Sequence, residues 1–107
     1  RNLPDNHPHR AFPSLTRAEM RIAQGRFSEA QVDAGRAFSL LSKALPAGHF
    51  AVEVARCRMG IALQGQGRNE EAKPLVEAAY RGLKTSNMPI SDRYLLPCKA
   101  AAAKFSA

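Results

Sequence analysis

The side chains best suited to covalent chemistry are the two cysteines, Cys57 and Cys98. A catalytic cysteine needs a positioned base, and the chain contains no Cys–His–Asn pattern. Two cysteines are also too few for a disulfide framework, and neither has a histidine or cysteine at metal-ligand spacing. We therefore predict two buried thiols that pack as small hydrophobic groups, which favours a reducing, cytoplasmic setting.

The three histidines favour a structural role over a chemical one. His7 and His49 occupy matching positions in two copies of a repeat, which predicts a place in equivalent loops. His9 could form only a weak surface pair with His7. Gly65 and Gly67 do not form a phosphate loop, because no Gly-Lys-Ser/Thr follows them. The sequence thus predicts no metal site, no cofactor and no catalytic constellation, and we expect the protein not to be an enzyme.

The excess of basic residues requires an anionic partner to be considered. The chain has 16 Lys and Arg but only 9 Asp and Glu, which gives a net charge of +7. Arg10, Arg17 and Arg21 can share one face of the first helix, and Arg56 and Arg58 lie on the next. Nucleic-acid patches combine such clusters with interleaved aromatic residues. Here carboxylates interrupt the clusters, namely Glu19, Glu29, Asp33 and Glu53. This disfavours nucleic acid, and an acidic peptide is at least as good a partner for the same arginines.

Length and composition indicate one globular domain. The chain has 107 residues, of which 45% are hydrophobic and 23% charged, a balance typical of folded domains. The longest apolar stretch, from Val52 to Leu63, is interrupted by charges and is too short to cross a membrane. Because the first residue is Arg1 and not Met, we expect a fragment of a larger protein.

An internal repeat organises the chain. When Leu3–Ala44 is laid over Leu45–Ser86, the run Gln24-Gly25-Arg26 falls on Gln66-Gly67-Arg68 without a gap. Self-similarity at a fixed period is typical of repeat architectures. The sequence therefore predicts repeat 1 at residues 3–44, repeat 2 at 45–86, and a C-terminal capping helix at 88–107.

Each repeat reads as two helices. The stretch 52–63 is apolar on nearly all sides, which predicts a central helix packed between neighbours. Left-handed glycines are expected to end the first helices, at Gly25 and at Gly65 to Gly67. The second helices should begin near Ser28, which with Gln31 forms a capping box, and near Asn69.

The remaining patterns complete an all-α prediction of five helices. The last helix should run from about Ser91, with a kink or a delayed start at Pro97. No segment alternates with period two, so no strand is expected. Small residues are expected where the two helices of a repeat cross, at Ala30, Ala37, Ala72 and Ala79.

The turn sequences Gln24–Ala30 and Gln66–Ala72 resemble the turn between the two helices of a tetratricopeptide repeat. The usual unit has about 34 residues. The longer unit of this chain, with Leu-Pro-x-x-His at Leu3–His7 and Leu45–His49, is similar to the long kinesin-light-chain form. This resemblance implies an α-solenoid of antiparallel helix pairs, about two and a half repeats long. Arg17 and Arg21 depart from the family pattern, which has a buried Leu and Tyr there.

The same resemblance implies a function. First helices of successive repeats would line a groove for a protein or peptide, either an amphipathic helix or a flanking segment of the chain itself. By position, the groove-lining residues would be Phe12, Leu15, Glu19, Ile22, Val54, Cys57, Ile61 and Gln64. We therefore expect a non-catalytic interaction module, as in the C-terminal part of a bacterial serine/threonine kinase or transcriptional regulator. Nucleic-acid binding and self-association into a homo-oligomer stay open as alternatives.

Overall fold

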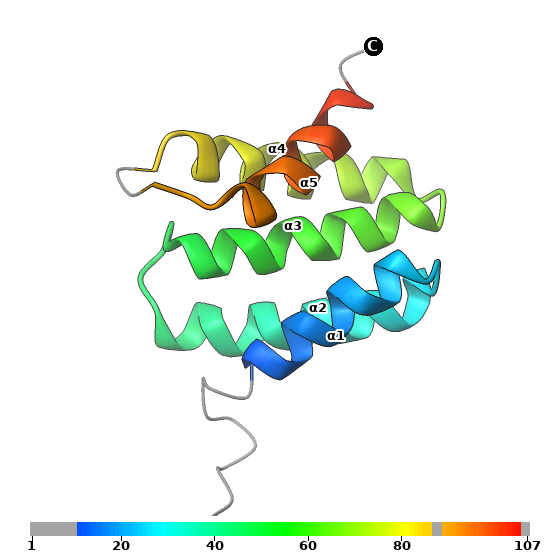
Figure 1. The fold of residues 1–107 in the computed structure, drawn as a ribbon, viewed down its shortest axis with the longest axis horizontal. Helices are drawn as coiled ribbons and strands as arrows, with labels where there is room; N and C mark the ends of the chain where they lie inside the picture. The colour runs from blue at the N-terminus through cyan, green and yellow to red at the C-terminus, as the bar shows by residue number, and fades with distance from the viewer. Residues whose placement is uncertain (1–10, 87–88, 106–107) are drawn as a thin grey trace, which may run out of the picture.

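Five α-helices form the part of the chain that the computed structural model describes, residues 11–86 and 89–105 (Figure 1). No strand occurs within these ranges, so the prediction of an all-α fold with five helices is confirmed. In chain order the helices are α1 (Ala11–Ala23), α2 (Phe27–Ala44), α3 (Phe50–Gly65), α4 (Asn69–Lys84) and α5 (Asp92–Ala103).

The third helix is the centre of the fold. It lies between α1 and α2 on one side and α4 and α5 on the other, and it contacts all four (Figure 1). Residues on every side of α3 are buried, among them Val54, Cys57 and Leu63. The apolar stretch 52–63 therefore has the central position that its composition predicts.

Two equivalent glycine turns join α1 to α2 and α3 to α4. Gly25 has φ 76° and Gly67 has φ 79°, a left-handed conformation that glycine adopts without steric cost. Past each glycine the backbone closes in the same way. The Arg26 amide donates to the Arg21 carbonyl at 2.8 Å, and the Arg68 amide donates to the Leu63 carbonyl at 3.0 Å. The predicted turns at Gly25 and Gly67 are thus confirmed.

Helix starts recur at the predicted spacing. The interval from the start of α2 at Phe27 to the start of α4 at Asn69 equals the interval from Phe50 of α3 to Asp92 of α5. Both intervals equal the predicted repeat length. The capping box expected at Ser28 is wrong, because α2 begins one residue earlier, after Arg26, and has no side-chain cap. Arg26 instead pairs with Glu29 at 2.6 Å.

Small side chains allow the helices to approach closely. The four alanines expected at crossings (Ala30, Ala37, Ala72 and Ala79) are all fully buried. Gly60 of α3 is a further such position, since a Cβ atom there would lie only 2.5 Å from Val76 Cγ2 of α4. The α3–α4 contact therefore depends on the absence of a side chain at Gly60.

The fifth helix starts where the sequence predicts and continues through its proline. The Ser91 hydroxyl accepts a hydrogen bond from the Arg93 amide at 3.3 Å and caps the helix. A delayed start at Pro97 is therefore wrong: this proline is the sixth residue of α5. The predictions made for His7, His9, Arg10 and the Leu3–His7 junction lie outside the described residues.

Candidate functional site

A shallow groove runs over α3 between α1 and α5. We call it the α1–α3–α5 groove. Its volume is about 260 Å³, and two residues from each helix line it: Glu19 and Ile22 of α1, Arg58 and Ile61 of α3, and Arg93 and Pro97 of α5. The groove thus combines an apolar lining with a cluster of three charges.

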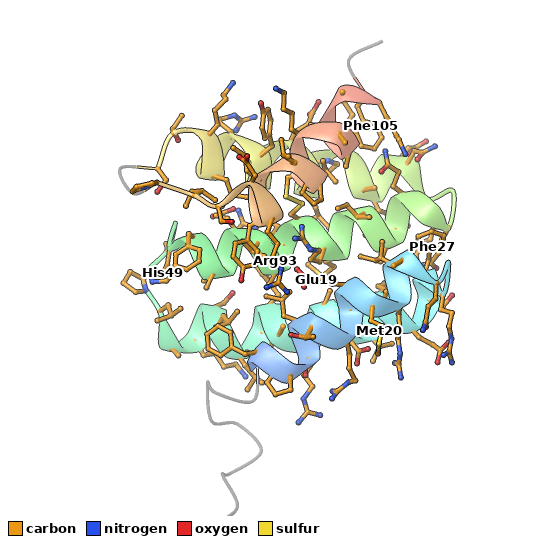
Figure 2. The ribbon with its side chains drawn as sticks, viewed as in Figure 1. Glu19, Met20, Phe27, His49, Arg93 and Phe105 are labelled. Carbon is orange, nitrogen blue, oxygen red and sulfur yellow. A yellow bond between two sulfur atoms is a disulfide. The ribbon has the colours of Figure 1, made fainter. Side chains whose placement is uncertain are left out.

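The charged cluster is built around one carboxylate. Glu19 Oε2 accepts from Nε of Arg58 at 3.0 Å and lies 3.0 Å from its Nη2. The other oxygen, Oε1, accepts from Arg93 Nη2 at 3.2 Å. Glu19 and Arg93 reach toward each other from opposite sides of the groove (Figure 2). Two guanidinium groups therefore share one carboxylate, which leaves the groove with a net positive charge.

The two arginines differ in their access to solvent. The side chain of Arg58 is 4% exposed, whereas that of Arg93 is 63% exposed. Burial lowers the pKa of the Arg58 guanidinium from its usual value, and the Glu19 carboxylate partly offsets this. Arg58 thus interacts only with groups inside the protein, while Arg93 can bind a further anion.

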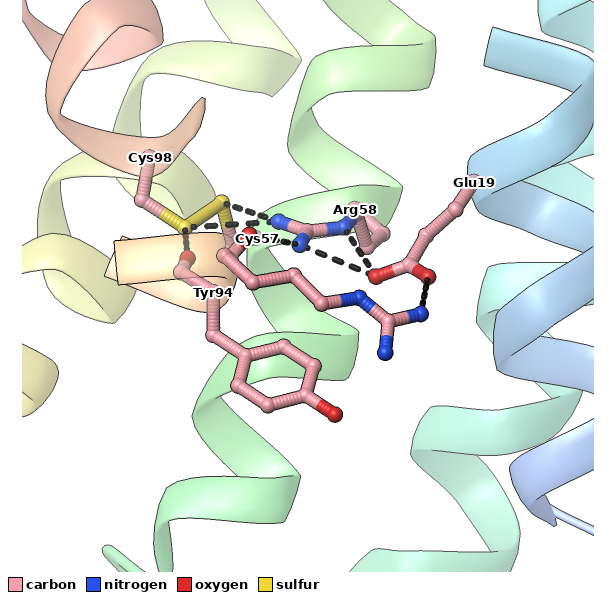
Figure 3. Close-up of a disulfide and its surroundings, with 6 residues drawn as sticks. Glu19, Cys57, Arg58, Tyr94 and Cys98 are labelled. Carbon is pink, nitrogen blue, oxygen red and sulfur yellow. Dashed lines mark hydrogen bonds and ion pairs between the residues drawn. A yellow bond between two sulfur atoms is a disulfide. The ribbon is translucent and has the colours of Figure 1, made fainter. Parts of the chain in front are cut away.

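The guanidinium of Arg58 also connects α3 to α5. Its Nη1 points at Cys57 Sγ and Cys98 Sγ, 3.7 Å from each (Figure 3). Its Nη2 donates to the Arg93 carbonyl at 3.4 Å. Proline has no amide hydrogen, so Pro97 cannot donate the helical hydrogen bond to this same carbonyl four residues earlier. Arg58 supplies the donor that Pro97 lacks.

The two cysteines form a disulfide between α3 and α5, with the sulfur atoms 2.04 Å apart (Figure 3). The prediction of two buried thiols is therefore wrong in its chemistry, although both residues are fully buried as expected. The physical reason is the packing of α5 against α3, which brings the two Cα atoms to 5.9 Å, within disulfide range.

The eight residues expected to line a groove lie in different parts of the structure. Glu19, Ile22 and Ile61 do line the α1–α3–α5 groove. Leu15, Val54 and Cys57 are core residues with 7%, 1% and 0% exposure, and they do not line this groove. Val54 and Cys57 face the core because α3 contacts all four other helices, and Leu15 of α1 packs into the same core cluster.

The last two of these residues lie away from the groove lining. Phe12 is 50% exposed and borders a separate apolar depression, together with Leu45 and Phe50. Gln64 is half-buried, and its Nε2 donates to the Ala101 carbonyl of α5 at 3.4 Å.

Sequence reasoning missed Arg93 and Pro97, which belong to α5, and it did not single out Arg58 as part of a groove. For Arg58 a signal existed, since a charge inside an apolar helix must find a partner when it is buried. For Arg93 and Pro97 no local signal existed, because only the docking of α5 on α3 brings them to the groove.

Most arginines prove to be paired within the fold. Arg17 and Arg21 of α1 both contact Asp33 of α2, at 3.5 and 2.9 Å. Arg56 pairs with Glu53 at 3.0 Å. These arginines hold neighbouring turns and helices together, and they do not form the continuous basic track that a nucleic acid would require.

His49 has the structural role that its repeat position predicts. It caps α3, where its Nδ1 accepts from the Ala51 amide at 3.1 Å. Its ring also stacks on Phe50, with 5.0 Å between the ring centres. A role at a helix cap accounts for this histidine without a ligand.

Comparison with protein-family models, with curated proteins and with solved structures finds no match. Across residues 11–86 and 89–105, no helix has both the length and the apolar character needed to cross a membrane. Within the same ranges, no three His, Cys, Asp or Glu side chains converge to hold a metal ion.

Proposed function

We propose that this chain is a non-catalytic protein-binding module of tetratricopeptide-like architecture. Three features support this architecture: equal intervals from the start of α2 to that of α4 and from the start of α3 to that of α5, matching left-handed turns at Gly25 and Gly67, and a central α3 packed between two neighbouring layers. In such an arrangement α1 with α2 and α3 with α4 are successive repeats, and α5 begins a third.

The α1–α3–α5 groove is the proposed binding surface, and its chemistry favours an acidic amphipathic helix. Ile22, Ile61 and Pro97 offer apolar contacts to one face of such a helix. The observation that carries the proposal is Arg93, whose side chain is 63% exposed beside a carboxylate already shared with Arg58. A carboxylate of the partner can pair with this exposed arginine.

The proposal can be tested by selecting helical peptides from a phage-displayed library on the immobilised protein. Affinities of selected peptides are then measured by fluorescence anisotropy. We expect them to combine an apolar face with Glu or Asp, and Ile22→Asp or Arg93→Gln to weaken them by about tenfold or more. Val32→Asp is the control, because Val32 is 71% exposed on α2 and lies outside the groove lining.

Circular dichroism of each variant separates lost binding from lost folding. Arg93→Gln is the more informative change, because this side chain is largely solvent-exposed and its loss leaves the core intact. Peptides that bind wild type, Ile22→Asp and Arg93→Gln with equal affinity would remove the groove from consideration.

Self-association is the second candidate function, because four large apolar side chains among the described residues are at least half exposed: Phe12, Met20, Val32 and Leu96. Light scattering over a range of protein concentrations distinguishes a dimer from a monomer. As to location, the Cys57–Cys98 disulfide favours an oxidising compartment over the cytoplasmic setting expected from the sequence.

A further inference from the structure

A second concave surface lies between α4 and α5, away from the groove. Its volume is about 490 Å³, and its lining includes Tyr80, Arg81 and Lys84 of α4, Lys99 and Ala102 of α5, and Glu77. We call it the α4–α5 basic pocket. Three cations and one carboxylate line it, so its side chains carry a net charge of about +2 at neutral pH.

Most of the described arginines pair with a carboxylate, whereas the three cations of the pocket do not. Seven of the described arginines lie within ion-pairing distance of Asp or Glu: Arg17, Arg21, Arg26, Arg56, Arg58, Arg68 and Arg93. Among the residues that the structure describes, none pairs in this way with Arg81, Lys84 or Lys99. The fold therefore neutralises most of its arginines and leaves these three cations together.

The dipole of α4 explains the position of only two of these three cations. Arg81 and Lys84 lie in the last turn of α4, where positive charge complements the helix dipole. That explanation does not extend to Lys99, which comes from the middle of α5 and lines the same hollow. Two separate helices thus direct positive charge into one concavity.

The pocket also has an apolar side. The Lys84 ammonium lies 5.2 Å from the centre of the Tyr80 ring, a cation–π contact that holds this lysine beside the ring. Tyr80, Ala102 and Ala103 can contact the organic part of a ligand, and the Tyr80 hydroxyl is a further hydrogen-bond donor.

We propose that the α4–α5 basic pocket binds the phosphate monoester of a small organic molecule. A phosphate monoester carries about −1.5 to −2 charges near neutral pH, which matches the pocket, whereas a carboxylate carries one. The volume is in the range of small-molecule pockets. A nucleic acid would require a longer track of free cations, and seven of the described arginines are paired with carboxylates instead.

The test uses AMP, adenosine and inorganic phosphate as probes in amide chemical-shift titrations of the oxidised protein. We expect AMP to saturate and to shift amides at the end of α4 and in α5. Inorganic phosphate should shift the same amides more weakly, and adenosine should leave them unchanged. The double variant Lys84→Gln/Lys99→Gln should weaken AMP by about tenfold or more, because each lysine supplies a charged contact.

Lys43→Gln is the matched control, since Lys43 is an exposed lysine of α2 outside the pocket, and it should leave AMP binding unchanged. The proposal would be overturned if adenosine bound as tightly as AMP, or if the lysine substitutions left the affinity for AMP unchanged. A short single-stranded RNA that binds far more tightly than AMP through the same lysines would replace it with a nucleic-acid site.

Discussion

Glu19 supplies the one carboxylate that contacts the guanidinium of Arg58, which is almost wholly buried. Arg58 is 4% exposed, and within the described residues its other contacts are the two sulfurs and one carbonyl. Removing one partner of a buried ion pair leaves an uncompensated charge, whereas exposed pairs contribute little. The Glu19–Arg58 contact is thus a structural requirement as well as part of the groove.

We expect Glu19→Ala to lower the free energy of unfolding by about 3 kcal/mol, the loss typical of a broken buried pair. The control is Glu29→Ala, which breaks the Arg26–Glu29 pair, whose side chains are 53% and 44% exposed. That change should cost less than about 1 kcal/mol. Urea denaturation of both variants measures the difference, and equal losses would show that Arg58 does not depend on Glu19.

The pKa of Glu53 is shifted in the opposite direction to that of most paired carboxylates. It is 5% exposed, and burial raises its pKa above the usual value, although Arg56 at 3.0 Å acts to lower it. The folded protein therefore holds this proton more tightly than the unfolded chain does. The contribution of Glu53 to stability is present at low pH and is lost as pH rises through its folded pKa.

We expect Glu53→Gln to gain stability relative to wild type as pH rises from about 4 to 7, because glutamine stays uncharged. Glu71→Gln should show the opposite slope at lower pH, since a hydrogen bond from Arg68 lowers the pKa of Glu71. Urea denaturation at a series of pH values compares them. A stability difference between Glu53→Gln and wild type that is independent of pH would contradict the assignment.

At the scale of helix pairs, two glycines inside helices have opposite roles. A methyl group at Gly60 would collide with Val76, whereas one at Gly35 of α2 would meet only Met59 Sδ at 3.8 Å. We expect Gly60→Ala to cost about 1 to 3 kcal/mol through overpacking. Gly35→Ala should stabilise by about 0.5 to 1 kcal/mol through helix propensity. Thermal denaturation should show shifts of opposite sign, and two stabilising changes would mean that α3 and α4 are less tightly packed.

The disulfide determines how firmly α5 is held. The backbone of α5 packs against α3 and α4, the Arg93 side chain also pairs with Glu19 of α1 at 3.2 Å, and Cys57 and Cys98 are 41 residues apart in sequence. A cross-link of that span stabilises by about 4 kcal/mol in the loop-entropy account. We expect Cys57→Ala/Cys98→Ala to lower stability by this order, and amides of α5 to lose hydrogen-exchange protection before those of α2. Unchanged protection in α5 would show that packing alone holds the helix.

Local determinants explain what was predictable from the sequence at this scale. Helix starts and the turns at Gly25 and Gly67 follow from periodicity and glycine conformation, which neighbouring residues determine. The Cys57–Cys98 disulfide and the Arg58–Glu19 pair depend instead on the angle at which helices distant in sequence cross. The capping box at Ser28 failed although it is local, because α2 begins one residue earlier, and Arg26 and Glu29 form an ion pair at its start.

At the scale of the molecule, we expect α3 to make the described fold one cooperative unit. It contacts α1 and α2 on one side and α4 and α5 on the other, so neither side can separate without exposing its buried residues. Stacked repeats can in principle unfold one after another when nearest-neighbour contacts are weak. In this chain the burial of α3 on all sides works against such separation.

Two single-tryptophan variants test this cooperativity, because the natural sequence contains no tryptophan. Phe12→Trp reports on α1, where the side chain is half exposed, and Phe105→Trp reports on the end beyond α5, where Phe105 packs against the cluster around Val76. In urea, with the disulfide intact, we expect both fluorescence transitions and the helical circular dichroism signal to share one midpoint. Circular dichroism also controls for any change in stability that a tryptophan introduces. Transitions at clearly different midpoints within one variant would show that the two ends unfold independently and that α3 does not couple them.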